Sequence, residues 1–263
     1  MSRVNMSDDD PVITQQPSAQ PVPTDKGGTP GPTRAKRGPV LEELEKLDKV
    51  ILSQEISALK LVCPCCIGRG AYTVHDETDS PDDVLLEIRE AFVCLYRPCL
   101  GSARDFTSRL HDFSDNDVVG SVRREISFRG CCITTCYLPE LHVSYPLPAK
   151  LGIIRERRTC CRPSFEILDG AGDVIFTFTN DCCYPQYCGF FMDYAIYVKD
   201  NEDEIIAKIV KKSYHNGEEL IGVENKLHIE FIKKIKATEK LLVINAALLV
   251  SLNNFEDSKR LCC

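Results

Sequence analysis

One stretch near the end of the chain, residues 241–252 (LLVINAALLVSL), constrains the fold more than any other. Only Asn245 and Ser251 interrupt its apolar character. As a helix it would span about 18 Å, whereas the hydrocarbon core of a bilayer is about 30 Å thick. An apolar helix too short to span a membrane is typical of the interior of a protein. We therefore predict a core helix over about residues 238–254, with a membrane-inserted segment as the alternative.

Short runs of β-branched and aromatic residues fill much of the chain before this helix. Turn residues separate them at roughly ten-residue spacing, which is typical of a β-barrel or a β-sandwich. Residues 169–173 (DGAGD) are predicted to be a hairpin turn, because no third glycine and no helix follow as in a phosphate loop. We therefore predict a mainly β fold closed around the apolar helix. The predicted strands cover residues 72–74, 84–88, 106–110, 118–122, 141–145, 152–155, 165–168, 174–178, 194–198 and 205–210.

An internal repeat favours a closed barrel over an open sandwich. Starting at Phe106 and again at Phe165, a strand leads through an aspartate turn, a second strand and a cysteine cluster to two further strands. Two similar units suggest a barrel with approximate two-fold symmetry, in which no strand edge is exposed.

The N-terminal part of the chain, residues 1–39, is predicted to be a disordered tail. Proline, glycine and small polar residues dominate it, and such a segment buries too little apolar area to fold. Its basic cluster, Arg34, Lys36 and Arg37, is interpreted as the solvated end of a linker, with contact to anionic lipid as the alternative. The proline-rich tail is also the part that we expect to contact other proteins.

The predicted domain covers residues 40–257, and residues 258–263 form a predicted cysteine-containing tail. At the start of the domain, residues 40–60 carry leucines at three- and four-residue steps, which predicts an amphipathic helix. The alternative is that residues 50–52 already begin a strand.

Composition and motifs exclude several classes of function. The net charge of −7 gives no reason to expect binding to nucleic acid. The chain lacks a Walker loop, a Gly-x-Ser-x-Gly motif and a His-Glu-x-x-His motif, so we predict that it is not an enzyme. Residues 1–40 lack the apolar segment of a signal peptide, so we expect the fifteen cysteines to be mostly reduced. Cys63 and Cys66 have the spacing of one half of a zinc site, but no second pair completes it.

Four landmarks in order resemble the phospholipid scramblase family, from about Val40 to Glu256. The first two are residues 41–51 (LEELEKLDKVI) and residues 104–110 (RDFTSRL). The third is the cysteine cluster of residues 131–136, followed by an alternating strand and a Pro-x-Pro motif, and the fourth is the terminal apolar helix.

The resemblance implies a closed twelve-stranded β-barrel around a C-terminal helix, a fold shared with tubby-like proteins. It also implies association with phospholipid membranes at the cytoplasmic face of the plasma membrane. The activity described for the family is movement of phospholipids between leaflets, which depends on calcium and does not need ATP.

In scramblase-like proteins the cysteine cluster carries palmitate, and here it is represented by Cys131, Cys132 and Cys136. Nearby Arg123, Arg124 and Arg129 would provide a second, electrostatic signal, since a single lipid chain binds only marginally. Protein that lacks the lipid would form a nuclear pool. The alternative is that these cysteines are small apolar residues packed at strand ends.

The remaining cysteines and the family's calcium segment have separate interpretations. Cys182, Cys183 and Cys188 are interpreted as packing residues, and the terminal Cys262 and Cys263 are weak candidates for prenylation. The family's calcium segment falls at residues 223–234, where Val223, Asn225 and Lys234 stand at positions for which the family prefers aspartate. The oxygen donors left there are Glu224, Asn225 and Glu230, opposed by Lys226, Lys233 and Lys234.

Calcium prefers six to eight oxygen ligands, mostly from carboxylates. We therefore expect weak calcium binding at the segment 223–234.

Two hypotheses of function follow. In the first, the protein scrambles phospholipids, which needs either assembly of several copies or insertion of the terminal helix into the bilayer. In the second, the barrel is a lipid-anchored interaction or signalling module that moves no lipid.

Overall fold

The computed structural model describes residues 39–55, 71–77, 84–90, 105–113, 116–125, 138–157, 164–179, 194–211 and 225–254. These residues form two helices and twelve strands, which fall in one compact unit. The elements are α1 (Val40–Lys46), β1 (Lys49–Glu55), β2 (Ala71–Asp76), β3 (Val84–Glu90), β4 (Phe106–Asp112), β5 (Val118–Arg124), β6 (Glu140–Ser144), β7 (Lys150–Arg157), β8 (Ser164–Asp169), β9 (Val174–Thr179), β10 (Tyr194–Lys199), β11 (Ile205–Lys211), β12 (Asn225–Phe231) and α5 (Ala237–Asn254).

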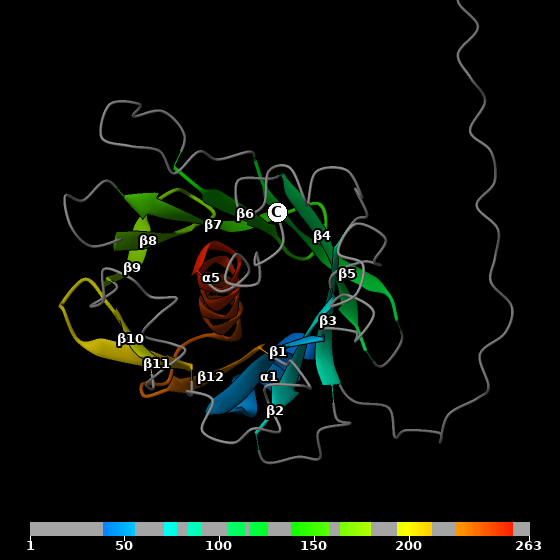
Figure 1. Ribbon diagram of the computed structural model, residues 1–263, viewed down its shortest axis with the longest axis horizontal. Coiled ribbons are helices and arrows are strands. Elements are labelled where there is room, and N and C mark those ends of the chain that lie inside the picture. Colours follow the sequence, from blue (N-terminus) through cyan, green and yellow to red (C-terminus); the bar gives the residue numbers. More distant parts are fainter. Residues whose placement is uncertain are drawn as a thin grey trace, which may run out of the picture. The chain divides into compact units, whose positions relative to one another are not determined.

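The twelve strands form one closed antiparallel barrel in which each strand pairs with its neighbours in the sequence. The barrel closes where β1 pairs with β12, with Val50 opposite Ile229 and Leu52 opposite Leu227. In Figure 1 the strands surround α5, which lies in the middle of the ring. The predicted mainly β fold with a closed barrel around a C-terminal helix is confirmed.

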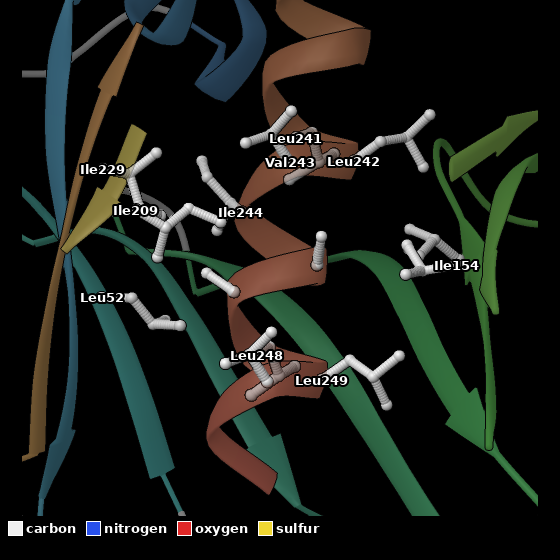
Figure 2. Packing of buried hydrophobic residues seen from close by; sticks show 14 of the residues in the cluster. Leu52, Ile154, Ile209, Ile229, Leu241, Leu242, Val243, Ile244, Leu248 and Leu249 are labelled. Atoms are coloured by element: carbon white, nitrogen blue, oxygen red, sulfur yellow. The ribbon is translucent and has the colours of Figure 1, made fainter. Parts of the chain in front are cut away.

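The core lies between α5 and the inward-facing side chains of the strands. Figure 2 shows Ile244 directed toward Ile209 and Ile229, and Leu242 and Leu249 directed toward Ile154 on the other side of the helix. The helix therefore contributes apolar side chains to opposite walls of the barrel at once. This explains why no face of the helix over residues 241–252 is predominantly polar.

Gly152 of β7 lies where a side chain would clash with β8 and with α5. A Cβ atom at this position would lie 2.3 Å from the carbonyl oxygen of Leu168 and 2.9 Å from Cδ2 of Leu242. Real Cβ atoms do not approach other atoms this closely, so the close packing of β7, β8 and α5 requires glycine here.

All ten strands predicted from the sequence are present, as β2 to β11. The helix predicted over residues 40–60 is confirmed only for α1, and the alternative of a strand around residues 50–52 is correct because β1 begins at Lys49. From Val50 onward β1 has neighbours on both sides, β2 and β12. The hydrogen bonds of these two ladders override the weak helical pattern of the sequence.

β12 was not predicted, because its residues were interpreted as a calcium segment. In the structure, Leu227, Ile229 and Phe231 are buried, whereas Lys226 and Glu230 are exposed. This alternation is that of a barrel strand with one face on the core.

The two units of the internal repeat correspond to β4–β7 and β8–β11. They are consecutive four-stranded arcs of the barrel, and β12, β1, β2 and β3 complete the ring. The repeat thus accounts for two arcs of four strands, and the third arc joins the two termini of the sheet.

The hairpin predicted at residues 169–173 is confirmed, since it joins the paired strands β8 and β9. Asp169 Oδ1 accepts hydrogen bonds from the backbone N–H groups of Ala171, Gly172 and Asp173, at 2.9, 2.9 and 3.0 Å. Gly172 has a φ of +96°, which glycine adopts without the steric cost of a side chain.

Candidate functional site

The helix α5 separates the two functional hypotheses, because lipid scrambling by insertion of this helix would require it to leave the barrel. Every side chain from Lys240 to Asn253 is buried. Among the residues that the structure describes, no helix is both long enough and apolar enough to cross a membrane. Because the side chains from Lys240 to Asn253 are buried inside the ring of strands, the prediction of an enclosed core helix is confirmed for α5.

Lys240 is a buried cation near the start of α5, and only 1% of its surface is exposed. Its Nζ donates hydrogen bonds to the carbonyl oxygens of Leu44, Glu45 and Leu47, at 3.2, 3.1 and 2.5 Å. These carbonyls lie at the C-terminal end of α1, where a helix leaves its last carbonyl groups without intrahelical partners. Lys240 therefore fastens α5 to α1 and places its charge where the helix dipole favours a cation.

The surroundings of Lys240 also perturb its titration. Burial lowers the pKa of Lys240 below its ordinary value, and this effect outweighs the opposite influence of the Asp48 and Glu45 carboxylates. The Nζ atom lies 5.0 Å from the centre of the Phe231 ring of β12, in a cation–π geometry.

A second buried cation holds the other end of α5. Arg124, the last residue of β5, has no exposed surface, and its Nη1 donates a hydrogen bond of 3.0 Å to Oδ1 of Asn253. In the middle of the helix, Asn245 Nδ2 donates to the carbonyl oxygen of Leu241 at 2.8 Å. The interior of the barrel is thus mostly apolar, with buried cations at both ends of the helix and the amide of Asn245 in the middle.

This arrangement leaves no polar path for a lipid headgroup through the described part of the barrel. The buried apolar side chains of α5 and of the strands form one cluster, part of which is drawn in Figure 2. Release of α5 would expose its apolar surface and break the bonds of Lys240 and Arg124. Each such buried hydrogen bond to a charged group stabilises the folded state by about 1.5–3 kcal/mol.

The predicted lipid-attachment residues, Cys131, Cys132 and Cys136, lie outside the described residues, between β5 and β6. The same holds for Arg129 of their basic flank. Of the other two arginines, Arg123 is exposed and lies 3.6 Å from the carboxylate of Glu125.

Arg124 does not contribute to a basic surface beside the cysteines, because its side chain points into the barrel. The prediction for this one residue was wrong. Val122 and Arg124 are two apart in a strand and share a face, so strict alternation would have placed Arg124 inside.

The predicted calcium ligands are not brought together by β12. Glu224 lies outside the described residues, and Asn225 pairs with Gln54 at the first position of the strand. Glu230 pairs with Lys49 near the other end, so about 17 Å of extended chain separates it from Asn225. Calcium ligands lie 2.3–2.6 Å from the ion. One ion therefore cannot be bound by both residues.

Glu230 already has a cationic neighbour on the outer surface of the barrel. Its carboxylate lies 3.5 Å from Nζ of Lys49, and both side chains are about half exposed. Lys233 forms ion pairs with Asp200, at 3.3 Å, and with Glu204. Within the described ranges, no group of three or more histidine, cysteine, aspartate or glutamate side chains is arranged to hold a metal ion.

Sequence reasoning did not identify the two buried cations as structural residues. The sequence analysis drew no conclusion from Lys240, and it assigned Arg124 to the basic residues beside the cysteine cluster. The signal for Lys240 was its place directly before the apolar run of residues 241–252, where a cation in the same helix requires buried partners.

A twelve-stranded barrel filled by its own C-terminal helix is the fold that the resemblance to phospholipid scramblases implied. The family model described as Scramblase matches residues 29–257, which include the barrel and α5. The chain therefore belongs to the Scramblase family.

Individual relatives are distant in sequence. Phospholipid scramblase 2 of Bos taurus is 24% identical over 219 residues, which are 83% of this chain and 72% of the relative. Phospholipid scramblase 1 of Homo sapiens is 24% identical over 230 residues, which are 84% of this chain and 67% of the relative. Phospholipid scramblase 1 of Mus musculus is 22% identical over 248 residues, which are 89% of this chain and 70% of the relative.

Proposed function

We propose that this protein is a lipid-anchored, scramblase-like protein that moves phospholipids in both directions between membrane leaflets without ATP. The observation that carries the proposal is the family match over residues 29–257, since it includes every element of the barrel and its helix. The relatives quoted above are named phospholipid scramblases.

The proposed attachment is through palmitate on Cys131, Cys132 and Cys136, at the cytoplasmic face of the plasma membrane. Arg123 supports the proposal, because it is an exposed cation near the end of β5, eight residues before Cys131. A basic residue near an acylated cysteine adds about 1 kcal/mol of attraction to an anionic leaflet. Replacing the three cysteines with serine should lower the membrane-bound fraction in cells, and an unchanged fraction would place the anchor elsewhere.

The proposed activity does not respond to micromolar calcium. Support comes from the separation of Asn225 and Glu230 along β12 and from the ion pair of Glu230 with Lys49. Sites with few carboxylates bind calcium at about 10⁻⁴–10⁻³ M. Titration calorimetry on the reduced protein should show no transition at micromolar calcium.

The direct test is transport by purified protein in vesicles that contain a fluorescent phospholipid in both leaflets. If the protein scrambles lipid, a membrane-impermeant quencher added outside will remove more than the half of the signal that the outer leaflet holds. The assay is run without ATP, once with a calcium chelator and once with calcium at about 10⁻³ M, the weak end of known sites. Quenching that stops at the outer leaflet in both conditions contradicts transport by this protein alone.

One observation favours a second function, that of a lipid-anchored interaction module without transport. The barrel interior is filled by α5, and the helix is fastened at both ends by Lys240 and Arg124. A barrel of this kind offers the bilayer a closed surface and no headgroup path. Membrane binding without transport in the vesicle assay would support this function.

A further inference from the structure

Two neighbouring turns at one end of the barrel expose large apolar side chains to solvent. The turn between β4 and β5 carries Phe113 and Val118, which are 41% and 40% exposed, and the turn between β6 and β7 carries Leu147, which is 44% exposed. We call this group of exposed residues the apolar tip. It consists of Phe113, Val118, Pro146, Leu147, Pro148 and Ala149.

Backbone hydrogen bonds hold the two turns of the apolar tip in place. The N–H of Asp112 donates to the carbonyl oxygen of Asp117 at 3.0 Å and closes the β4–β5 turn. The N–H of Leu147 donates to the carbonyl oxygen of Val119 at 3.2 Å and joins the β6–β7 turn to the start of β5. The apolar tip is therefore a preformed surface, which a partner would not have to order on binding.

The apolar tip gathers half of the large apolar side chains that are exposed among the described residues. Of the other three, Tyr197 lies on the barrel wall in β10, with Nζ of Lys208 5.7 Å from the centre of its ring. Ile205 and Ile232 lie beside β11 and β12, three strands away from β4–β7 in either direction around the ring. Single exposed apolar side chains are ordinary on a protein surface, whereas a group of them indicates a contact with another molecule.

Acidic side chains lie on both sides of the β6–β7 turn. Asp112 and Asp117 belong to the β4–β5 turn, and Asp169 and Asp173 belong to the β8–β9 turn. Lys150 is the one lysine or arginine in the described parts of these three turns. We call the four aspartates the acidic rim. Their excess of negative charge favours a partner with positive charge at the contact.

Two observations place the acidic rim close to the apolar tip. Burial, and after it the charge of Asp112, raises the pKa of Tyr145 above its ordinary value, so this carboxylate lies near the residue before Pro146. On the other side, a Cβ atom at Gly170 would lie 2.9 Å from the carbonyl oxygen of Lys150. The β8–β9 turn therefore packs directly against the end of the β6–β7 turn.

A second copy of the same chain does not fit this surface. In a two-fold symmetric contact the same patch of each copy faces the other, so the two acidic rims would come together. Like charges that meet across an interface oppose association. The charge around the apolar tip therefore disfavours contact with itself.

A membrane does not fit the surface either. In an antiparallel barrel whose strands follow the sequence, successive connections lie at alternate ends. The β4–β5 and β6–β7 turns thus lie at the end opposite to the β5–β6 connection, to which Cys131, Cys132 and Cys136 belong. The proposed anchor would point the apolar tip away from the bilayer, and an anionic leaflet would repel the acidic rim.

We propose that the apolar tip binds a protein partner whose contact surface combines large apolar side chains with lysine or arginine. Val118 and Leu147 provide the apolar anchors, and the acidic rim faces the cations of the partner. Buried anchors carry most of the affinity of an interface, and charges at its rim mainly set the rate of association. The proposal names the partner class of the interaction module described under the proposed function, and its choice of a protein over a membrane rests on the proposed anchor.

The probe is a phage-displayed library of random peptides, selected on the purified, reduced protein in solution. We expect the enriched peptides to combine leucine, phenylalanine or tryptophan with lysine or arginine. The affinity of synthetic copies is then measured for the unaltered protein and for Leu147→Asp. The variant should bind them about tenfold more weakly or worse, because it places a charge at an apolar anchor.

The matched control is Ile232→Asp, which places the same charge at another exposed apolar position, on a different part of the ring. It should bind the peptides as tightly as the unaltered protein. Asp117→Lys tests the acidic rim, and it should slow association and reduce the salt dependence of binding. Melting curves equal to that of the unaltered protein show that the three variants do not act through folding.

The proposal is overturned if no peptide is enriched, if the enriched peptides lack basic residues, or if they bind Leu147→Asp as tightly as the unaltered protein. A dimer in sedimentation that becomes a monomer in Leu147→Asp would assign the apolar tip to a second copy instead. Phosphatidylcholine vesicles that bind the unaltered protein and not Leu147→Asp would assign it to lipid. These measurements do not depend on lipid transport, so the transport assay tests the proposed function separately.

Discussion

The helix α5 and the strand β12 follow each other in the sequence but relate to the core in opposite ways. All side chains of α5 from Lys240 to Asn253 are buried, whereas in β12 every second residue faces outward. The buried half of β12 is Leu227, Ile229 and Phe231, with 3%, 1% and 5% exposure. The comparison shows that position relative to the barrel wall, and not local composition, decides what a charged residue does here.

The same comparison separates two kinds of charge. Lys240 lies inside the barrel with three carbonyl partners, and Glu230 lies outside beside Lys49. A buried charge without its partners costs several kcal/mol, and an exposed ion pair contributes about 1 kcal/mol or less.

An aspartate in the middle of α5 should unfold the domain. In Leu242→Asp or Leu248→Asp the carboxylate would be buried among apolar side chains on every side, at a cost of several kcal/mol. Chemical denaturation or circular dichroism would measure the loss. The matched control is Ile232→Asp just after β12, where the side chain is 55% exposed and the change should stay within about 0.5 kcal/mol. Equal stability of the core and control variants would contradict an enclosed α5.

A methyl group at Gly152 should destabilise the contact between α5 and β7. The new Cβ would clash with the carbonyl oxygen of Leu168 and with Leu242, and overpacking of this kind costs about 1–3 kcal/mol. The unfolding free energy of Gly152→Ala is compared with that of Lys150→Ala, an exposed position in the same strand that should change little. If Gly152→Ala left the unfolding free energy unchanged, α5 would not pack closely against β7.

Replacing the buried cation of α5 should have a moderate effect that depends on pH. Lys240→Met removes the ammonium donor from the carbonyls of Glu45 and Leu47, which costs about 1–3 kcal/mol, whereas the carbonyl of Leu44 keeps the N–H of Leu47. Because burial lowers the pKa of Lys240 in the folded state, the unfolded chain holds this proton more tightly. The contribution of the lysine to stability is therefore constant below the lowered pKa and rises with pH from there to the ordinary value of 10.5.

The measurement for Lys240 is the difference in unfolding free energy between the unaltered protein and Lys240→Met, taken from neutral pH upward. This difference should grow as the pH rises through the window. A difference that shrinks, or a variant as stable as the unaltered protein, would show that the carbonyl contacts do not hold the helix.

The smallest effect is expected on the outer face of β12. Glu230→Gln removes a half-exposed ion pair with Lys49 and should change the unfolding free energy by less than about 1 kcal/mol. It should also leave calorimetric titrations with calcium unchanged. A micromolar calcium transition that disappears in Glu230→Gln would restore calcium control as a property of this segment.

Much of the fold could be predicted because the spacing of apolar residues indicates helices and strands directly. The run at residues 241–252 indicated the core helix, and the alternating segments indicated ten of the twelve strands. The two strands that were missed or left open, β1 and β12, are the pair that closes the barrel. Their assignment depends on pairing between residues 171 to 181 positions apart, such as Gln54 with Asn225 and Lys49 with Glu230, which no local pattern contains.

The candidate sites were less predictable for a related physical reason. The calcium hypothesis counted the oxygen donors of residues 223–234 without regard to their direction and separation. The hypothesis of a basic surface included Arg124 without regard to the face of the strand on which it lies. In a strand, residues one apart point to opposite sides, and residues five apart are far from each other. The side of the barrel wall on which a side chain lies had to come from the structure.

Hydrogen exchange of α5 in the membrane-bound protein tests the central claim most directly, namely that the helix stays inside the barrel. The amides of residues 241–252 should exchange as slowly on phosphatidylserine-containing vesicles as in solution, at the rate set by unfolding of the whole domain. Faster exchange of these amides on vesicles, while the barrel strands remain protected, would contradict the claim. It would show that the helix leaves the barrel to act on the lipid.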